Sequence, residues 1–258
     1  MVWYFLSDEP GEPGHNMARD MALLDLAAER GVGFVRTYTW TPYALSFGAN
    51  EPAEKRYDRA LIESRGLAVV RRPTGGRAVW HAEELTYAVA APDGALGTLT
   101  ESYRIIHEYL AEALRSMAVG SDLSLADRPT GPLALDAGAC FAAPVGGEVV
   151  SALGKVVGSA QLRERGALLQ HGSILIDNRQ ELVGEITRGD APASSAAALS
   201  QVLGRPIRPG QVVGAITTTL GTRLGQLLPL DAELRGALEE RTAHHLPKFF
   251  DPAWTWRR

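Results

Sequence analysis

Apolar positions recur along this chain at two different spacings, which predict helices in some stretches and strands in others. A spacing of three and four residues, typical of a helix with one buried face, begins after Asn16 and again after Thr98. Asn16 is expected to cap the first helix, and Gly31 and Gly33 are expected to end it. Thr98 and Glu101 have the spacing of a capping box, which opens the clearest helix of the chain. Further helices are predicted at residues 53–64, 194–203, 211–227 and 231–248.

Short apolar runs predict the strands, most of which lie in the first two thirds of the chain. Residues 3–6 are expected to form an edge strand, and residues 148–160 a hairpin that turns at Leu153 and Gly154. The other strands are predicted at residues 34–40, 43–47, 67–70, 85–90 and 167–176. Strands followed by helices indicate an α+β fold. We therefore predict one domain over residues 1–258, with a core at 1–190 and a helical C-terminal extension at 191–258.

The composition is that of an ordinary globular protein, with 45% hydrophobic and 22% charged residues in 258. A net charge of -4 excludes the overall basic field that is typical of nucleic-acid-binding proteins. Three glycines and Arg223 interrupt the apolar segment 212–228, so no membrane span is expected. The N-terminus lacks the basic stretch of a signal peptide, and the single cysteine, Cys140, excludes an intramolecular disulfide. These features predict a cytoplasmic protein.

A loop between two predicted strands, residues 71–81, carries three arginines and a pair of glycines. Glycine lets the backbone approach a ligand closely, and guanidinium groups offer forked donors for phosphate or carboxylate. The loop is therefore expected to bind an anionic or strongly polar group. Its candidate binding residues are Arg71, Arg72, Thr74, Gly75, Gly76, Arg77 and His81.

Cys140 and Lys155 are the candidate catalytic residues. Cys140 is flanked by glycine and alanine, which leave space around its sulfur, although most lone cysteines are small buried apolar side chains. Lys155 begins a strand with apolar neighbours and is either an exposed turn residue or a buried cation. If the two lie together, the positive charge favours the thiolate, which is the nucleophilic form of cysteine.

Two further segments are candidates for the wall of a binding pocket. Gly158, Ser159 and Ala160 keep side chains small where a ligand or another backbone comes close. His171, followed by Gly172, is a general base, a pocket donor or a structural histidine. The sequence contains no cluster with metal-ligand spacing and no phosphate-loop or dinucleotide fingerprint, so no metal is expected.

Together these segments resemble the lipoate-protein ligase A and lipoyl(octanoyl) transferase family, over most of the chain from residue 16 to 175. The most specific matches are RRPTGGRAVWH at 71–81 with ELTY at 84–87, and Gly154-Lys155 followed by GSAQ at 158–161. Ala82 departs from the family, whose members usually have Asp after this histidine. The resemblance implies an α+β catalytic domain like that of biotin protein ligases and class II aminoacyl-tRNA synthetases, with a mixed sheet flanked by helices. Its pocket would hold an octanoyl or lipoyl chain.

The position of Cys140, fifteen residues before Lys155, resembles the ligase-like branch of octanoyl-[acyl-carrier-protein]:protein N-octanoyltransferases. This resemblance implies that Cys140 takes an octanoyl group from octanoyl-acyl carrier protein as a thioester. A lysine of a lipoyl domain, or of the glycine cleavage H protein, would then receive it as an amide. Lys155 would keep Cys140 ionised, while Arg163 and Arg165 would add positive charge for the acidic carrier protein. No cofactor, nucleic acid or membrane partner is expected, and the chain is expected to be a monomer.

Three other functions fit the same residues. An ATP-dependent lipoate or octanoate ligase would use the arginine loop for an adenylate phosphate and would need ATP and Mg²⁺. Such ligases commonly read Arg-Arg-x-Ser-Gly-Gly-Gly, where this chain has Thr74 and Arg77. The second is an amidotransferase that moves octanoyl groups between lipoyl domains. The third is a non-catalytic lipoyl-domain or acyl-chain binding protein, which the presence of both Cys140 and Lys155 argues against.

Overall fold

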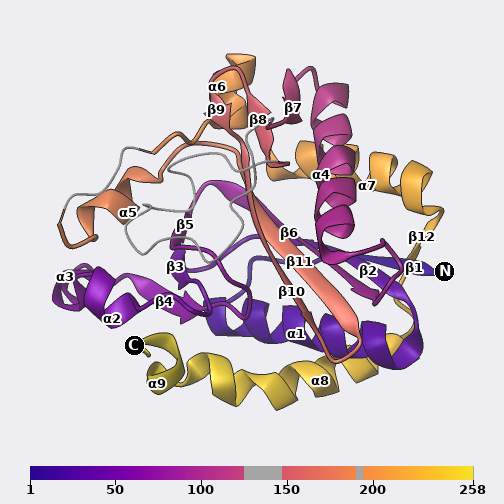
Figure 1. Ribbon diagram of the computed structural model, residues 1–258, viewed down its shortest axis with the longest axis horizontal. Coiled ribbons are helices and arrows are strands. Elements are labelled where there is room, and N and C mark those ends of the chain that lie inside the picture. Colours follow the sequence, from indigo (N-terminus) through magenta and orange to yellow (C-terminus); the bar gives the residue numbers. More distant parts are fainter. Residues whose placement is uncertain (125–146, 190–193, 258) are drawn as a thin grey trace.

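A twisted six-stranded sheet forms the centre of the molecule (Figure 1). The computed structural model describes residues 1–124, 147–189 and 194–257. The strand order is β10-β11-β6-β2-β1-β12, in which β1 pairs in parallel with β2 and β12, and the other pairs are antiparallel. The strands are β1 (Trp3–Ser7), β2 (Gly33–Tyr38), β6 (Glu84–Pro92), β10 (Val157–Glu164), β11 (Ala167–Leu175) and β12 (Leu227–Pro229).

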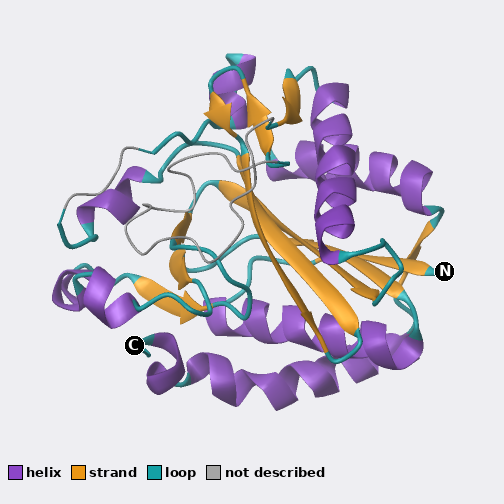
Figure 2. Ribbon diagram, viewed as in Figure 1, coloured by secondary structure: helices purple, strands orange, loops and turns teal. Residues whose placement is uncertain are grey.

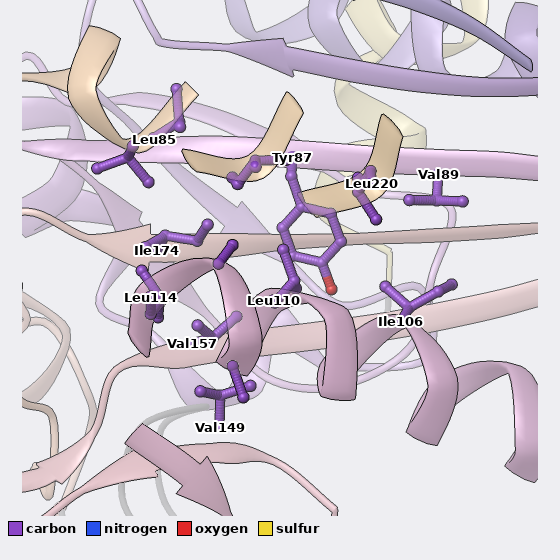
Figure 3. Packing of buried hydrophobic residues seen from close by; sticks show 14 of the residues in the cluster. Leu85, Tyr87, Val89, Ile106, Leu110, Leu114, Val149, Val157, Ile174 and Leu220 are labelled. Atoms are coloured by element: carbon purple, nitrogen blue, oxygen red, sulfur yellow. The ribbon is translucent and has the colours of Figure 1, made fainter. Parts of the chain in front are cut away.

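Helices cover both faces of this sheet (Figure 2). On one face α1 (Pro13–Arg30) lies beside α8 (Ala232–Phe250), and on the other α4 (Leu99–Ser116) packs with α7 (Pro209–Leu224). Successive strand side chains point to opposite faces, so Ala88 and Ala90 face α1, whereas Tyr87 and Val89 face α4. Figure 3 shows this second cluster, in which Tyr87 lies among leucine and isoleucine side chains of α4. The predicted α+β fold, a mixed sheet flanked by helices, is therefore what the structure shows.

Two small sheets flank the main one. The first has the order β4-β3-β5 and lies beside the short helices α2, α3 and α5, and the second has the order β7-β8-β9. The strands are β3 (Ala44–Phe47), β4 (Ala68–Arg71), β5 (Val79–His81), β7 (Ser121–Leu123), β8 (Val149–Ser151) and β9 (Gly154–Lys155). The short helices are α2 (Ala53–Arg56), α3 (Arg59–Ser64), α5 (Glu181–Glu185), α6 (Leu199–Leu203) and α9 (Pro252–Thr255).

The strongest local signals of the sequence are confirmed. Thr98 and Glu101 form the capping box of α4, with both reciprocal hydrogen bonds present. Gly31 ends α1 in the left-handed conformation, with φ of 66°. Residues 53–64 form two short helices rather than one, and the helix predicted from residue 194 begins at Leu199.

Three local predictions were wrong, each because a tertiary contact decides the outcome. Helix α1 begins at Pro13, which suits a first helical turn, while the Asn16 side chain bonds backbone carbonyls of Gly11 and Thr39. Strand β1 is not an edge strand, because β12 pairs with it from the far end of the chain. The hairpin at 148–160 is limited to β8 and β9, since β10 leaves it to join the main sheet.

The C-terminal segment is part of the main fold as well as a cover for it. Within residues 194–257 it supplies β12 to the sheet and packs α8 along α1. The predicted domain bounds, 1–190 and 191–258, stay a prediction. Within the described ranges, no helix is both long enough and apolar enough to cross a bilayer.

Replacing Thr98 with alanine is expected to lower the free energy of unfolding by about 1 kcal/mol, because the start of α4 loses its cap. Urea denaturation monitored by far-ultraviolet circular dichroism measures the change. Thr218→Ala, at an exposed position inside α7, is the matched control and should not destabilise, since alanine is the better helix former. Equal losses in the two variants would contradict the role of the cap.

Candidate active site

A narrow pocket lies between the main sheet and the small β4-β3-β5 sheet. Met17 from α1, Trp40 and Val79 make its apolar wall. The sequence-predicted residues that line it are Arg72 and His81 of the arginine loop, Gly158, Ser159 and Ala160 of β10, and His171 and Gly172 of β11. The fold therefore brings together segments that are about a hundred residues apart in the sequence.

Beside this pocket, two pairs of backbone segments lie so close together that only glycine fits between them. A Cβ on Gly172 would lie 2.5 Å from the carbonyl oxygen of Gly158 and 2.4 Å from Ser159 Oγ. A Cβ on Gly48 would lie only 1.9 Å from the carbonyl oxygen of Gly76, whose own φ of 88° favours glycine. Small residues at these positions are thus required by packing, whether or not a ligand is bound.

Arg71 points away from the pocket. Its side chain is fully buried and donates to backbone carbonyls on two sides. On one side the acceptors are Gly48, Ala49 and Glu51, and on the other they are Trp254, Thr255 and Arg257. Burial, together with the charges of Arg257 and Arg72, lowers the pKa of Arg71 to about 10, so it stays charged at neutral pH. The structure shows Arg71 fastening the C-terminal segment to the loop, and its predicted substrate contact stays a prediction.

Arg72 lines the pocket and also holds the arginine loop in shape. Its guanidinium donates to the carbonyls of Ser46, Gly75 and Arg77, over distances of 2.6 to 3.1 Å. These backbone bonds use most of its donors within the protein. Arg77 is itself buried. The loop is therefore a rigid, self-bonded structure.

A buried chain of hydrogen bonds connects the arginine loop to α1. Thr74 Oγ1 lies 2.6 Å from His171 Nε2, and His171 Nδ1 lies 2.8 Å from Asp20 Oδ2. Burial disfavours the charge of Asp20, but Arg36 and the hydrogen bonds of His171 and Tyr38 hold the pKa of its carboxyl below the ordinary value. An ionised Asp20 only accepts, so His171 donates from Nδ1.

His81 is held between the pocket and a buried carboxylate. Its ring stacks on Trp40 at 4.0 Å between ring centres, Nε2 lies 2.7 Å from Ser46 Oγ, and Nδ1 lies 3.1 Å from Glu84 Oε1. Burial lowers the pKa of His81, although Glu84 opposes this effect. The ring is neutral at pH 7 and shapes the wall of the pocket.

Lys155 is a buried cation rather than an exposed turn residue. Lys155 and Glu148 are 1% and 3% exposed, and Nζ lies 2.7 Å from Glu148 Oε1. Val150 pairs with Lys155 across the β8–β9 hairpin, and Glu148 lies two residues away on the same side. Cys140 lies outside the described residues, so its distance from Lys155 stays a prediction.

Several buried polar residues were missed by sequence reasoning. Asp20 lies within the apolar stripe of α1, where a buried acid signals a partner, and Glu148 faces Lys155 across the predicted hairpin. His107 also escaped notice, although it lies on the apolar face of the clearest helix. Among the described residues, no group of three or more histidine, cysteine or acidic side chains is placed to hold a metal.

Comparison with known proteins defines the class. The sequence model of the lipoyl protein ligase A/B catalytic domain matches residues 12–221, and the chain belongs to this family. Octanoyltransferase LipM of Kyrpidia tusciae is 34% identical over 274 residues, which cover 100% of this chain and 99% of that protein. Octanoyltransferase LipM of Geobacillus kaustophilus is 40% identical over 191 residues, covering 70% and 68%. The prediction of an acyltransferase from the ligase-like branch is confirmed by these relatives.

Solved structures with the same fold are lipoate-protein ligases. Lipoate-protein ligase A bound with ATP superimposes with a TM-score of 0.79 at 18% identity, covering 99% of both chains. The bipartite lipoate protein ligase of Thermoplasma acidophilum gives a TM-score of 0.73 at 18% identity, covering 99% of this chain and 96% of that one. At such identities the likeness shows the fold alone, and it confirms the predicted α+β fold.

Replacing Arg71 with lysine is expected to lower the free energy of unfolding by about 2–3 kcal/mol, because a single ammonium cannot reach carbonyls on both sides of the side chain. Urea denaturation measures the loss, and limited proteolysis should show faster cleavage in the C-terminal segment. Arg205→Lys, at an exposed position, is the matched control. Unchanged stability in Arg71→Lys would contradict the fastening role.

The Glu148–Lys155 pair is expected to show strong coupling in a double-mutant cycle of Glu148→Gln and Lys155→Met. Each single change should cost roughly 3 kcal/mol in unfolding free energy, and the double variant less than the sum by about 1–3 kcal/mol. The exposed Arg59–Glu63 pair, also 2.7 Å apart, is the control and should couple by less than about 0.5 kcal/mol. Additive losses at Glu148 and Lys155 would show that the pair contributes no interaction energy.

Proposed function

We propose that this protein transfers an octanoyl group to a lysine of a lipoyl domain. The observation that carries the proposal is the narrow pocket, whose wall combines apolar side chains with the small residues of β10. An extended acyl chain fits such a shape, because a wide or strongly charged ligand would meet backbone or buried apolar surface. The octanoyltransferase relatives that match the chain along its length support the same substrate class.

The donor in this proposal is octanoyl-acyl carrier protein, and Cys140 is the acyl carrier. The Cys140 thiolate attacks the carbonyl of the donor thioester, and the carrier protein leaves as a thiolate. The amine of the acceptor lysine then attacks the octanoyl-enzyme carbonyl and loses a proton, while Cys140 leaves as a thiolate. The acceptor protein is a lipoyl domain or the glycine cleavage H protein. Neither step requires a cofactor.

Lys155 supports this chemistry as a cation. The ion pair with Glu148 holds the Lys155 ammonium group in one position. In the proposal this charge favours the ionised form of Cys140. Backbone N–H groups of the Gly75–Gly76 turn and of residues 158–159 are candidates to bind the negative oxygen that forms during each step. The protein acts as a monomer in the cytoplasm in this proposal.

Incubation with octanoyl-acyl carrier protein alone is expected to add one octanoyl group to the protein, seen by intact mass spectrometry. Cys140→Ala should give no adduct, because it lacks the attacking sulfur. Subsequent addition of a lipoyl domain should remove the adduct from the enzyme and place it on the acceptor lysine.

The competing functions give different outcomes in the same experiment. Transfer that needs ATP and free octanoate, with no adduct from the carrier protein, would show a ligase. An adduct formed only from an octanoylated lipoyl domain or H protein would show an amidotransferase. The absence of any adduct or transfer would leave a binding protein.

A further inference from the structure

A second cleft adjoins the pocket through Trp40 and His81. These two side chains line both spaces, so the cleft and the pocket are direct neighbours. The cleft lies between the residues that follow β2, the start of β6 and the start of α7, and its volume is about 550 Å³. A space of this size can take a side chain of a partner protein.

Two consecutive carboxylates, Glu83 and Glu84, line this cleft. Successive residues of a strand point to opposite faces, but Glu83 precedes β6 in the left-handed conformation, with φ of 51°, and does not follow this alternation. Its carbonyl oxygen accepts from the N–H groups of Ile176 and Asp177, which fixes the turn. Glu83 is exposed and lies at the rim, whereas Glu84 is only 4% exposed. The described residues that line the cleft include no lysine or arginine.

One oxygen of the buried Glu84 carboxylate, Oε2, has no hydrogen-bond partner among the described residues. The other oxygen, Oε1, accepts from Thr86 Oγ1 at 2.5 Å and lies 3.1 Å from His81 Nδ1. Glu84 lines the cleft but not the pocket, so Oε2 is directed toward the cleft. Because a buried polar atom without a partner costs free energy, its presence here favours a role in binding.

Glu84 differs from the other buried acids of the described chain, because no lysine or arginine pairs with it. Four others each form an ion pair with such a residue, namely Asp20 with Arg36, Asp25 with Arg165, Glu51 with Arg56 and Glu148 with Lys155. Within the described ranges, the ion-pair partner of Glu84 is His81 alone. Burial lowers the pKa of His81, so this ring supplies no positive charge at neutral pH. Since a buried carboxylate is stabilised by a paired cation, the site favours a positively charged group.

The other walls of the cleft suit the stem of a lysine side chain. Ile176, Ile207 and Pro209 form an apolar side, and the methylene groups of a lysine pack on such a surface while its ammonium reaches a polar group. Tyr43 is 47% exposed and lines the same cleft, and its hydroxyl donates to Glu83 Oε1 at 2.7 Å. Exposed tyrosines are enriched where a partner protein packs, so the rim suits a protein ligand.

We propose that this cleft receives the acceptor lysine of the lipoyl domain and that the Glu84 carboxylate binds its ammonium group. Glu83 adds negative charge at the rim. The wall shared by Trp40 and His81 places the bound lysine beside the pocket that takes the acyl chain. An ammonium suits the site better than a metal ion, because the described residues hold no group of three or more ligating side chains. The inference rests on the proposed transfer to a lysine.

The test is a double-mutant cycle that combines Glu84→Gln with a lipoyl domain whose acceptor lysine is replaced by methionine. Isothermal titration calorimetry measures the dissociation constants of the four pairs. Loss of the lysine should weaken binding to the unchanged protein roughly 10- to 100-fold, and binding to Glu84→Gln by less than about 3-fold. Glutamine keeps an oxygen for Thr86 and His81, so the urea midpoint should not fall. Glu240→Gln, exposed on α8, is the matched control and should keep the full effect of the lysine.

Transfer kinetics give a second measurement that does not depend on the energy source of the reaction. With whichever donor the unchanged protein uses, octanoyl-acyl carrier protein or octanoate with ATP, Glu84→Gln should raise the KM for the lipoyl domain at least about 10-fold. An unchanged KM, or an equal effect of the lysine on both proteins in the binding cycle, would overturn the inference and leave octanoyl transfer intact. If the unchanged protein transfers to a lipoyl domain from neither donor, the proposed function and the inference both fail.

Glu83→Gln carries the same cycle if Glu84→Gln does not fold, because Glu83 is exposed and its replacement leaves the interior unchanged. An exposed charge interacts more weakly, so the expected coupling with the acceptor lysine is about 3-fold. Additive effects in this cycle would likewise overturn the inference.

Discussion

The arrangement of the site depends on one buried carboxylate, Asp20. It has no exposed surface, and a charge in that position is tolerated only when it is paired and hydrogen-bonded. Arg36 supplies the opposite charge at 2.7 Å, and Tyr38 and His171 supply the remaining hydrogen bonds. These partners come from β2 and β11, so the hydrogen bonds of Asp20 fix α1 relative to two strands of the sheet. His171 also bonds Thr74, which fixes the arginine loop relative to the same elements.

A second constraint is the way in which the arginine loop is built. Two of its arginines are used mainly to bind backbone carbonyls, Arg71 toward the C-terminal segment and Arg72 within the loop. A guanidinium suits this task because its five donors spread in a plane and remain charged at neutral pH. The sequence of this loop is typical of an anion-binding site. In the structure, however, Arg71 and Arg72 mainly bind backbone carbonyls and so hold the loop in its conformation.

Two different parts of the structure provide the pocket and the buried positive charge. A narrow, largely apolar pocket between the sheets suits an acyl chain, and a buried cation fixed by Glu148 lies on the neighbouring hairpin. On the other face of the sheet, the Ser159 hydroxyl bonds His107 of α4 and Tyr87. Polar groups whose hydrogen bonds are satisfied inside a protein keep fixed directions.

The sequence by itself determined the local features and the family. The capping box at Thr98 and the left-handed end of α1 at Gly31 depend only on residues that are close in the sequence. The motifs at 71–81 and 154–161 identify the family by their residue types alone. Only the tertiary structure decided which polar groups meet. Asp20 and His171 are 151 positions apart, and Arg71 reaches carbonyls more than 180 positions away. Contacts of this kind follow from how the sheet orders its strands, including the pairing of β12 with β1, which no local spacing of apolar residues encodes.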